Sequence, residues 1–344
     1  MLMTENQRPG VYSGYTVEGL YAAPRSQQFV AVVLAGHAQT AGTLHHFTGR
    51  EAIADTLGQE EDKKIAACVE QLLDGGVPRV VVSAVNGKAA AALALLEGAE
   101  NIAAVVSDIS GGEDSLALRT FLERESENQR EKIAFVGATG TAAQVEAAAK
   151  AMNHARVCLC YPAATAAGGT EADSIYGAAA MACAVLIERD PVYNWNGHRL
   201  EGLSHCEKLP EAEVQDLLAA GVTVLEEKAQ AVRCIRAMTS KSATNGAADS
   251  TMRSLNTVLI IDEVMKSLRD TLQVKMAGRR LSPDSIRTQA AVVLAEKQEE
   301  GLLEGFAVPE VSAAPENPAV CVVKISFRAA QVLSQIHIVA HINI

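Results

Sequence analysis

From residue 62 onward, hydrophobic and polar positions alternate between two periods. Segments with helical spacing of apolar residues cover residues 62–76, 88–98, 114–129, 141–152 and 173–188. Between them stand continuous apolar runs that are typical of buried strands: "PRVVVSAV", "NIAAVVSDI", "KIAFVG" and "RVCLCYP". Helices that alternate with fully apolar strands favour parallel βαβ units with helices on both faces of the sheet. We therefore predict an α/β fold with a mostly parallel sheet for this part of the chain.

The pattern changes after "ERDPVYNWNGHRLEGL". The segment "GVTVLEEKAQAVRCIRAMT" predicts two strands that turn near Lys228 to Gln230. Helices are expected at 211–220, about 250–274 and 283–304. "VPEVSAAPENP", residues 308–318, has the composition of a Pro-spaced linker, and "AVCVVKISFRAA" that of a strand. The second half is thus predicted to be α+β.

The last residues of the sequence, "SQIHIVAHINI", alternate strictly between isoleucine or alanine and other side chains. This period of two is typical of a half-buried strand. No turn signal follows that would return the strand to a sheet of its own, and a terminal segment frays unless something holds it. We therefore expect its partner strands to lie elsewhere.

Composition and charge bound the class of protein. A chain of 344 residues favours two domains, and its aromatic share of 4% favours close packing of small side chains. The net charge of −11 argues against generic nucleic-acid binding. Residues 228–300 are locally basic, with 12 Lys and Arg against 8 Asp and Glu, whereas residues 1–227 hold 16 against 30. The basic segment could face an acidic partner.

Cysteine usage and hydropathy indicate a reducing compartment. The seven cysteines are scattered, mostly in apolar runs, and no CxxC motif occurs, so buried free thiols are favoured over disulfides or a zinc site. "MLMTENQRPG" has no apolar signal-peptide core, and "GAAAMACAVLI" is too short to cross a bilayer. We expect synthesis and assembly in the cytoplasm without membrane insertion.

Candidate chemistry is sparse. "FVGATGTAAQ", residues 135–144, joins a strand to a helix through a Gly-rich turn, but it lacks GxGxxG and the Gly-Lys-Ser/Thr ending of a phosphate loop. His45 and His46 have no carboxylate at ligand spacing, and Asp262 and Glu263 are typical of a solvated helix edge. We predict no catalytic, cofactor-binding or metal-binding residues, and therefore no enzyme and no cofactor.

Both chain ends and the order of segments between them carry a resemblance. "RPGVYSGY" stands near the start, and "LHHFTGREAIADTLG", "NHARVCLCYP", "SIYGAAAMACAVLIERDPVYNWNGHRLEGL" and "SLRDTLQVKMAGRRLSPDSIRTQAAVVLAEKQEEGLLEGF" follow in that order. The series resembles the contractile tail sheath proteins of phages, R-type bacteriocins and related injection systems, over essentially the full length. One segment departs from the family pattern, since a frequent "GaRT"-like element is "IRAMTSKS" here.

The resemblance implies a domain organisation with two exchanged arms. The expected parts are an N-terminal arm (1–21), an outer α/β domain (22–205), an inner α+β domain that faces the tube (206–330) and a C-terminal strand arm (331–344). In this family the arms add strands to sheets of neighbouring subunits. The residues expected to do so here are Val11, Tyr12, Tyr15, Ile336, Ile338, Ile342 and Ile344.

The resemblance also implies partners and a mechanism. Copies of the chain would form stacked hexameric rings around a tail tube protein, bounded by baseplate and tail terminator proteins, and contract without nucleotide. The particle would be assembled in the cytoplasm and then released. The basic segment supplies candidates for contact with an acidic tube, although a solvated helix face is an equal alternative for each: Lys266, Arg269, Lys275, Arg279 and Arg280.

Two other classes remain open at this point. A nucleotide- or NAD-binding α/β enzyme would explain residues 62–190, but it leaves both chain ends unexplained and lacks a complete fingerprint. A non-contractile, self-assembling filament or shell protein would explain the ends as well as a sheath does.

Overall fold

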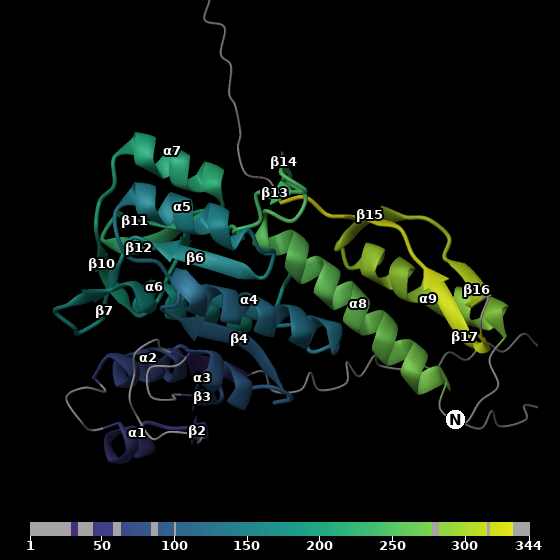
Figure 1. Ribbon diagram of the computed structural model, residues 1–344, viewed down its shortest axis with the longest axis horizontal. Coiled ribbons are helices and arrows are strands. Elements are labelled where there is room, and N and C mark those ends of the chain that lie inside the picture. The colour runs from purple at the N-terminus through teal and green to yellow at the C-terminus, as the bar shows by residue number, and fades with distance from the viewer. Residues whose placement is uncertain are drawn as a thin grey trace, which may run out of the picture.

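The computed structural model describes residues 29–33, 44–57, 63–83, 89–99, 101–276, 282–314 and 317–332. The residues expected to form the two exchanged arms lie outside these ranges: Val11, Tyr12, Tyr15, Ile336, Ile338, Ile342 and Ile344. Within the described ranges the chain forms a large sheet module and a smaller C-terminal module (Figure 1).

A nine-stranded sheet with the strand order β2-β3-β1-β4-β5-β6-β11-β12-β9 is the centre of the larger module. The six strands from β3 to β11 run parallel, and the strands at the two ends of the sheet pair antiparallel. Their bounds are β1 Phe29–Val33, β2 Leu44–Phe47, β3 Val80–Ser83, β4 Ile102–Ser107, β5 Ile133–Gly137, β6 Val157–Tyr161, β9 His198–Arg199, β11 Val222–Lys228 and β12 Ala231–Arg236. The predicted α/β fold with a mostly parallel sheet is confirmed.

Helices cover both faces of this sheet (Figure 1). One face packs against α2 (Lys63–Asp74) and α6 (Ser174–Glu188), with α1 (Glu51–Thr56) beside α2. Four helices cover the other face: α3 Ala89–Leu95, α4 Gly112–Glu127, α5 Ala142–Met152 and α7 Glu211–Ala220. Because helices cover both faces of the sheet, the side chains on both faces of each strand are buried. This explains why the strands are apolar throughout.

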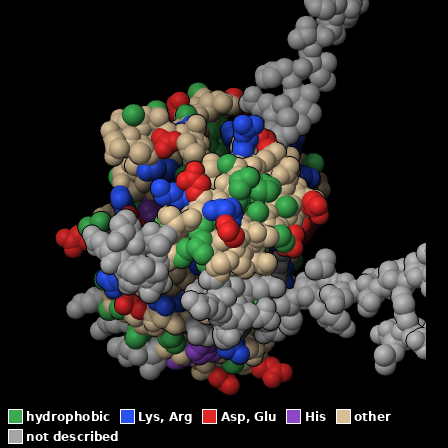
Figure 2. Space-filling model, turned by 90° about the vertical axis from the view of Figure 1, so that its right-hand side faces the viewer, with side chains coloured by type: hydrophobic (Ala, Val, Ile, Leu, Met, Phe, Trp, Pro, Cys, Tyr) green, Lys and Arg blue, Asp and Glu red, His purple; other side chains and the backbone are tan. Residues whose placement is uncertain are grey.

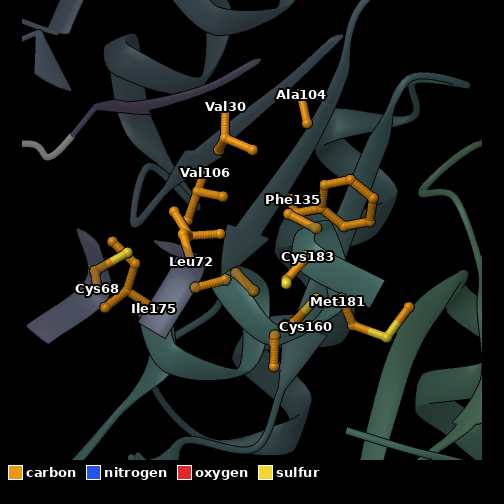
Figure 3. Packing of buried hydrophobic residues seen from close by; sticks show 14 of the residues in the cluster. Val30, Cys68, Leu72, Ala104, Val106, Phe135, Cys160, Ile175, Met181 and Cys183 are labelled. Carbon is orange, nitrogen blue, oxygen red and sulfur yellow. The ribbon is translucent and has the colours of Figure 1, made fainter. Parts of the chain in front are cut away.

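Each strand therefore contributes to two hydrophobic clusters. Phe135 of β5 belongs to the cluster beneath α2 and α6, whereas Val136 belongs to the cluster beneath α3, α4, α5 and α7. Figure 3 shows the first cluster, where strand side chains such as Val106 and Phe135 meet Leu72 of α2 and Ile175 of α6. Alternation of this kind fixes the register of every strand.

The C-terminal module packs around its own hydrophobic cluster. Two long helices, α8 (Leu255–Met276) and α9 (Pro283–Glu299), lie side by side and contribute Ile260, Val264 and Val293 to it. Two antiparallel strand pairs complete the module: β15 Leu303–Phe306 with β18 Phe327–Ala329, and β16 Glu310–Ala314 with β17 Asn317–Lys324.

Short strands form two further antiparallel sheets. One has the order β10-β7-β8, and the other pairs β13 with β14. Their bounds are β7 Ala164–Ala166, β8 Ala172–Asp173, β10 Leu203–Cys206, β13 Ala243–Thr244 and β14 Ala247–Ala248.

The sheet module continues past residue 205, since β6 and β11 pair in parallel and β12 follows β11. The division into an outer and an inner domain at 205/206 stays a prediction. Two other sequence-based expectations need correction. The expected linker 308–318 contains strand β16, because Glu310–Ala314 pairs antiparallel with β17. The helix expected over 283–304 ends at Glu299, where Gly301 takes a positive φ of 80° and the chain turns into β15.

The predicted hairpin of β11 and β12 is confirmed. Ala229 and Gln230 join the two strands, and both have positive φ, at 52° and 58°. Two consecutive residues of this kind match the twist of the strands that they connect.

Candidate functional site

Open α/β sheets bind their ligands at the carboxyl edge of the parallel strands. The chain proceeds from β1 to β3 on one side and returns to β4 on the other, which makes the β1/β4 position a topological switch point, where ligands bind in open α/β sheets. Here an ion triad joins three elements at that edge. The Lys64 amine of α2 lies 3.2 Å from Oδ2 of Asp108, which follows β4, and 3.1 Å from Oδ2 of Asp173, which precedes α6.

Lys64 bridges the two carboxylates of this triad. Burial alone would lower the pKa of Lys64, but the carboxylates of Asp108 and Asp173 outweigh burial and raise it. Asp173 also caps α6, since its Oδ1 accepts a hydrogen bond of 3.0 Å from the backbone N–H of Ile175. The triad is thus a structural connection between α2, β4 and α6.

The candidate phosphate loop after β5 is occupied by the chain's own groups. Thr141 and Gln144 form a capping box at the start of α5, in which the backbone N–H of Thr141 donates to Gln144 Oε1 at 2.9 Å. A Cβ atom added to Gly137 would lie 2.4 Å from the carbonyl carbon of Ser174. The loop is therefore pressed against α6 and its helix N-terminus is capped, which supports the interpretation as a plain βα turn.

The cysteines are free and mostly buried, as the sequence predicts. Cys68, Cys158, Cys160, Cys183, Cys206 and Cys234 are buried, and Cys321 on β17 is exposed. Burial raises the pKa of Cys68, Cys206 and Cys234 to about 12, so these thiols stay protonated at neutral pH.

The described residues provide neither a cluster of metal ligands nor a membrane-spanning helix. In those ranges no three His, Cys, Asp or Glu side chains come close enough together to hold a metal ion, and His45 and His46 lie on opposite faces of β2. Of the helices that the structure describes, none combines the length and hydropathy needed to cross a membrane.

The five residues expected from the sequence to contact a tube differ in their surroundings: one is exposed, one is paired within the subunit, and three lie outside the described side chains. Lys266 is exposed on α8. Arg269 is only 24% exposed and pairs with Glu131 of the sheet module, with Nη1 at 2.8 Å from Oε1. The remaining three lie outside the described side chains: Lys275, Arg279 and Arg280.

Asp262 and Glu263 are not a solvated helix edge, contrary to the sequence-based interpretation. Asp262 accepts two hydrogen bonds of 2.6 Å from the guanidinium of Arg156, and Glu263 accepts one of 3.2 Å from Lys297. Each carboxylate is about one-fifth exposed, at 21% and 22%. The sequence signal for this is weak: the two carboxylates directly follow the apolar run "VLII", residues 258–261.

The C-terminal module presents open strand edges. Among the described residues, β16 pairs with β17 alone and β15 with β18 alone, so each pair has outer edges whose backbone groups face no further described strand. Unpaired edges of this kind are templates for strands of another chain. The registers place Val311 opposite Val323 and Phe306 opposite Phe327.

Exposed hydrophobic side chains accompany these edges. Val308 beside β16 is 72% exposed, Val274 near the end of α8 is 73% exposed, and Val292 and Val322 are 45% and 40% exposed. Figure 2, which looks onto this end of the molecule, shows hydrophobic side chains among acidic and basic ones. An open edge with apolar neighbours is typical of an interface with another protein.

The fold defines a class: a doubly wound α/β module joined to a small α+β module with open strand pairs. Neither a scan of the sequence against models of known protein families nor a search of curated proteins gives a match. Solved structures do match, over nearly the whole chain.

Three of the matching solved structures are sheath proteins. A sheath tail protein from Desulfitobacterium hafniense matches with a TM-score of 0.67 at 8% identity, over 93% of this chain and 100% of that one. A sheath tail protein from Listeria innocua matches with a TM-score of 0.65 at 13% identity, over 88% and 92%. The anti-feeding prophage helical sheath in its contracted state matches with a TM-score of 0.68 at 13% identity, over 98% and 100%. The chain therefore has the fold of a tail sheath protein.

Proposed function

We propose that the chain is a subunit of a contractile sheath. Copies would polymerise as stacked hexameric rings around an inner tube and shorten to drive that tube through a target envelope. The observation that carries this proposal is the match of 98% of the chain to the anti-feeding prophage helical sheath. The open strand pairs of the C-terminal module support it, because they offer backbone groups to strands from other copies.

In this proposal the arms link neighbouring subunits. Residues around Val11 to Tyr15 and Ile336 to Ile344 would add strands to the β15–β18 or β16–β17 pair of adjacent copies. Alternating isoleucines would set the register, and main-chain hydrogen bonds would supply affinity. Electron microscopy of the purified protein tests the proposal, which expects striated six-fold tubes and is contradicted by particles without helical order.

The proposed layers follow from the two modules. The C-terminal module, with the chain ends, would face the tube, and the sheet module would face solvent. Lys266 is the described, exposed candidate for the tube contact, and Lys275, Arg279 and Arg280 remain candidates by sequence. Arg269 is engaged with Glu131 in the subunit and is a weaker candidate.

Charge reversal tests the tube contact. Reversing Lys266, Lys275, Arg279 and Arg280 together to Glu should weaken attachment of the sheath to its tube, more strongly at low than at high salt, because salt screens exposed charges. Reversal of the exposed Arg199 on β9 is the control. Unchanged attachment at every salt concentration would refute the contact.

Contraction in this proposal uses energy stored during assembly. Subunits would be held in a metastable arrangement and would repack when a baseplate protein releases them, so no nucleotide is consumed. Cytoplasmic assembly, a tube protein, a baseplate and a terminator as partners, and release of the finished particle all belong to the same proposal.

A further inference from the structure

Two charged pairs join the C-terminal module to the amino edge of the sheet. Arg156 precedes β6, and its two Nη atoms donate hydrogen bonds of 2.6 Å to the two carboxylate oxygens of Asp262 on α8. Glu131 precedes β5, and its two oxygens each lie 2.8 Å from an Nη atom of Arg269 on α8. Both pairs are bidentate, which fixes their orientation as well as their distance.

The two pairs are crossed: each surface contributes one acid and one base, and each acid faces the base of the other surface. On α8 the acid, Asp262, precedes the base, Arg269, by seven residues, so both lie on one face two turns apart. On the sheet the base, Arg156, stands at β6, and the acid, Glu131, at the adjacent strand β5. Sliding α8 along the edge by two turns would place Arg269 opposite Arg156, where like charges repel. The crossed pattern therefore favours one register of α8 and disfavours others.

The pairs act on a helix that belongs to both hydrophobic cores. Leu255 and Val258 at the start of α8 pack in the sheet cluster, whereas Val264 and Leu268 pack in the cluster of the C-terminal module. The Asn256 side chain adds an anchor at this first turn, since its Nδ2 donates to two backbone carbonyls of the loop before β9, at 2.7 and 2.8 Å.

The far side of α8 carries the rest of the module. Lys297 of α9 is 7% exposed, and its amine lies 3.2 Å from Glu263 and 2.9 Å from Glu300. Asp262 thus contacts the sheet while its neighbour Glu263 contacts α9. A rotation or shift of α8 would move the whole C-terminal module with it.

Burial opposes the charged forms of both Arg156 and Asp262, and it is the largest single influence on the pKa of each. Burial raises the pKa of Asp262 even though the Arg156 guanidinium opposes the shift. Desolvation of a buried pair offsets much of its attraction, and such pairs are best known for specifying one arrangement among several.

We propose that Arg156, Asp262, Glu131 and Arg269 are positioning residues that set the register and angle at which the C-terminal module docks on the sheet. This inference concerns the single subunit and does not depend on the proposed function. Its consequence for a sheath, that a change of this angle would displace the tube-facing surface, is the one part that rests on it.

Spin-label distances between the modules test the proposal. One label goes on the exposed native Cys321 of β17, and the other on Leu116→Cys of α4, a position that is 64% exposed. Labelled protein is diluted with unlabelled protein so that distances within one chain dominate. The parent protein should give a single narrow distribution. The neutral variants Arg156→Gln and Asp262→Asn should each lose that single peak, and Asp262→Arg should broaden the distribution most.

Rescue and control variants make the result specific. Arg156→Asp combined with Asp262→Arg should restore a single peak. The control is Arg50→Gln, which removes another two-point Arg–Asp contact, with Asp74, that lies within the sheet module and is exposed. Arg50→Gln should leave the distribution unchanged. Should a variant at Arg156 or Asp262 fail to fold, as circular dichroism would reveal, Arg269→Gln and Glu131→Gln provide the same test. Folded neutral variants that keep the parent distribution would overturn the proposal.

Discussion

The carboxylate of Glu125 lies 3.0 Å from the amine of Lys132, and the two side chains are 0% and 1% exposed. They meet where α4 ends and β5 is about to begin. Arg130 completes the cluster by donating two hydrogen bonds to Glu125, at 2.8 and 3.0 Å. Burial would raise the pKa of Glu125, but the hydrogen bonds from Arg130 and Lys132 outweigh burial and lower it from 4.5 to about 2.

This shift predicts a loss of stability in acid. Because the folded-state pKa of Glu125 lies below the unfolded value, its contribution is complete above about pH 4.5 and is lost as the pH falls toward 2. We expect the urea midpoint of the parent protein to fall over that window, and that of Glu125→Gln to start lower and fall less. Glu127→Gln, at an exposed position of the same helix, is the control. Equal pH dependence of all three proteins would contradict the assignment.

Gly137 predicts a steric effect. A Cβ atom at this position would lie 2.4 and 2.5 Å from backbone atoms of Ser174, which cannot move aside as a flexible side chain can. Gly137→Ala should therefore lower the free energy of unfolding by about 1 to 3 kcal/mol or more, as overpacking does. Gly49→Ala, where no atom lies within 4 Å, should have little effect in the same urea titration. Equal stability of the two variants would show that the β5–α6 contact is looser than described.

Thiol reactivity should distinguish Cys321 from the other six cysteines. Thiolates are the reactive species, and six of the seven thiols are buried, with pKa values raised by burial to about 11 for Cys183 and about 12 for Cys68. A colorimetric thiol reagent should therefore titrate one thiol rapidly in the dilute folded protein and all seven in denaturant. Cys321→Ser should abolish the rapid phase. A rapid phase that survives in Cys321→Ser would place a second thiol within reach of solvent.

The sheet module follows from the sequence because its signal is local. Continuous apolar runs such as that of β5 must be covered on both faces, and the helices between them have clear starts and stops, such as Thr141 before α5. Element type and order were therefore predictable. Strand order was not, because the position of β1 between β3 and β4 depends on contacts between segments that are distant in the sequence.

The site was harder to predict for the same reason. In the sequence, nothing distinguishes Asp262 and Glu131 from ordinary surface carboxylates. Their partners, Arg156 and Arg269, lie 106 and 138 residues away from them. Likewise, β16 was missed because Pro309 and Pro315 suggested a linker, whereas pairing with β17 sets its conformation. Long-range pairing outweighs local composition in both cases.

Removal of the C-terminal arm tests assembly separately from folding. Deleting Ile336 to Ile344 leaves every described residue in place, since these end at residue 332. We expect a folded monomer with the circular dichroism spectrum of the full chain that forms no tubes in electron micrographs. Tubes formed by the truncated protein would show that this arm is not needed to link subunits.

The proposed function requires that the assembled chain contracts. Full-length protein co-assembled with its tube protein should give long sheaths that cover the tube, and a mild perturbation that leaves the subunits folded should convert them irreversibly to shorter, wider sheaths with bare tube protruding. Electron microscopy before and after the perturbation measures both lengths directly. Sheaths that keep one length and width until the subunits unfold would contradict the account and leave a static filament in its place.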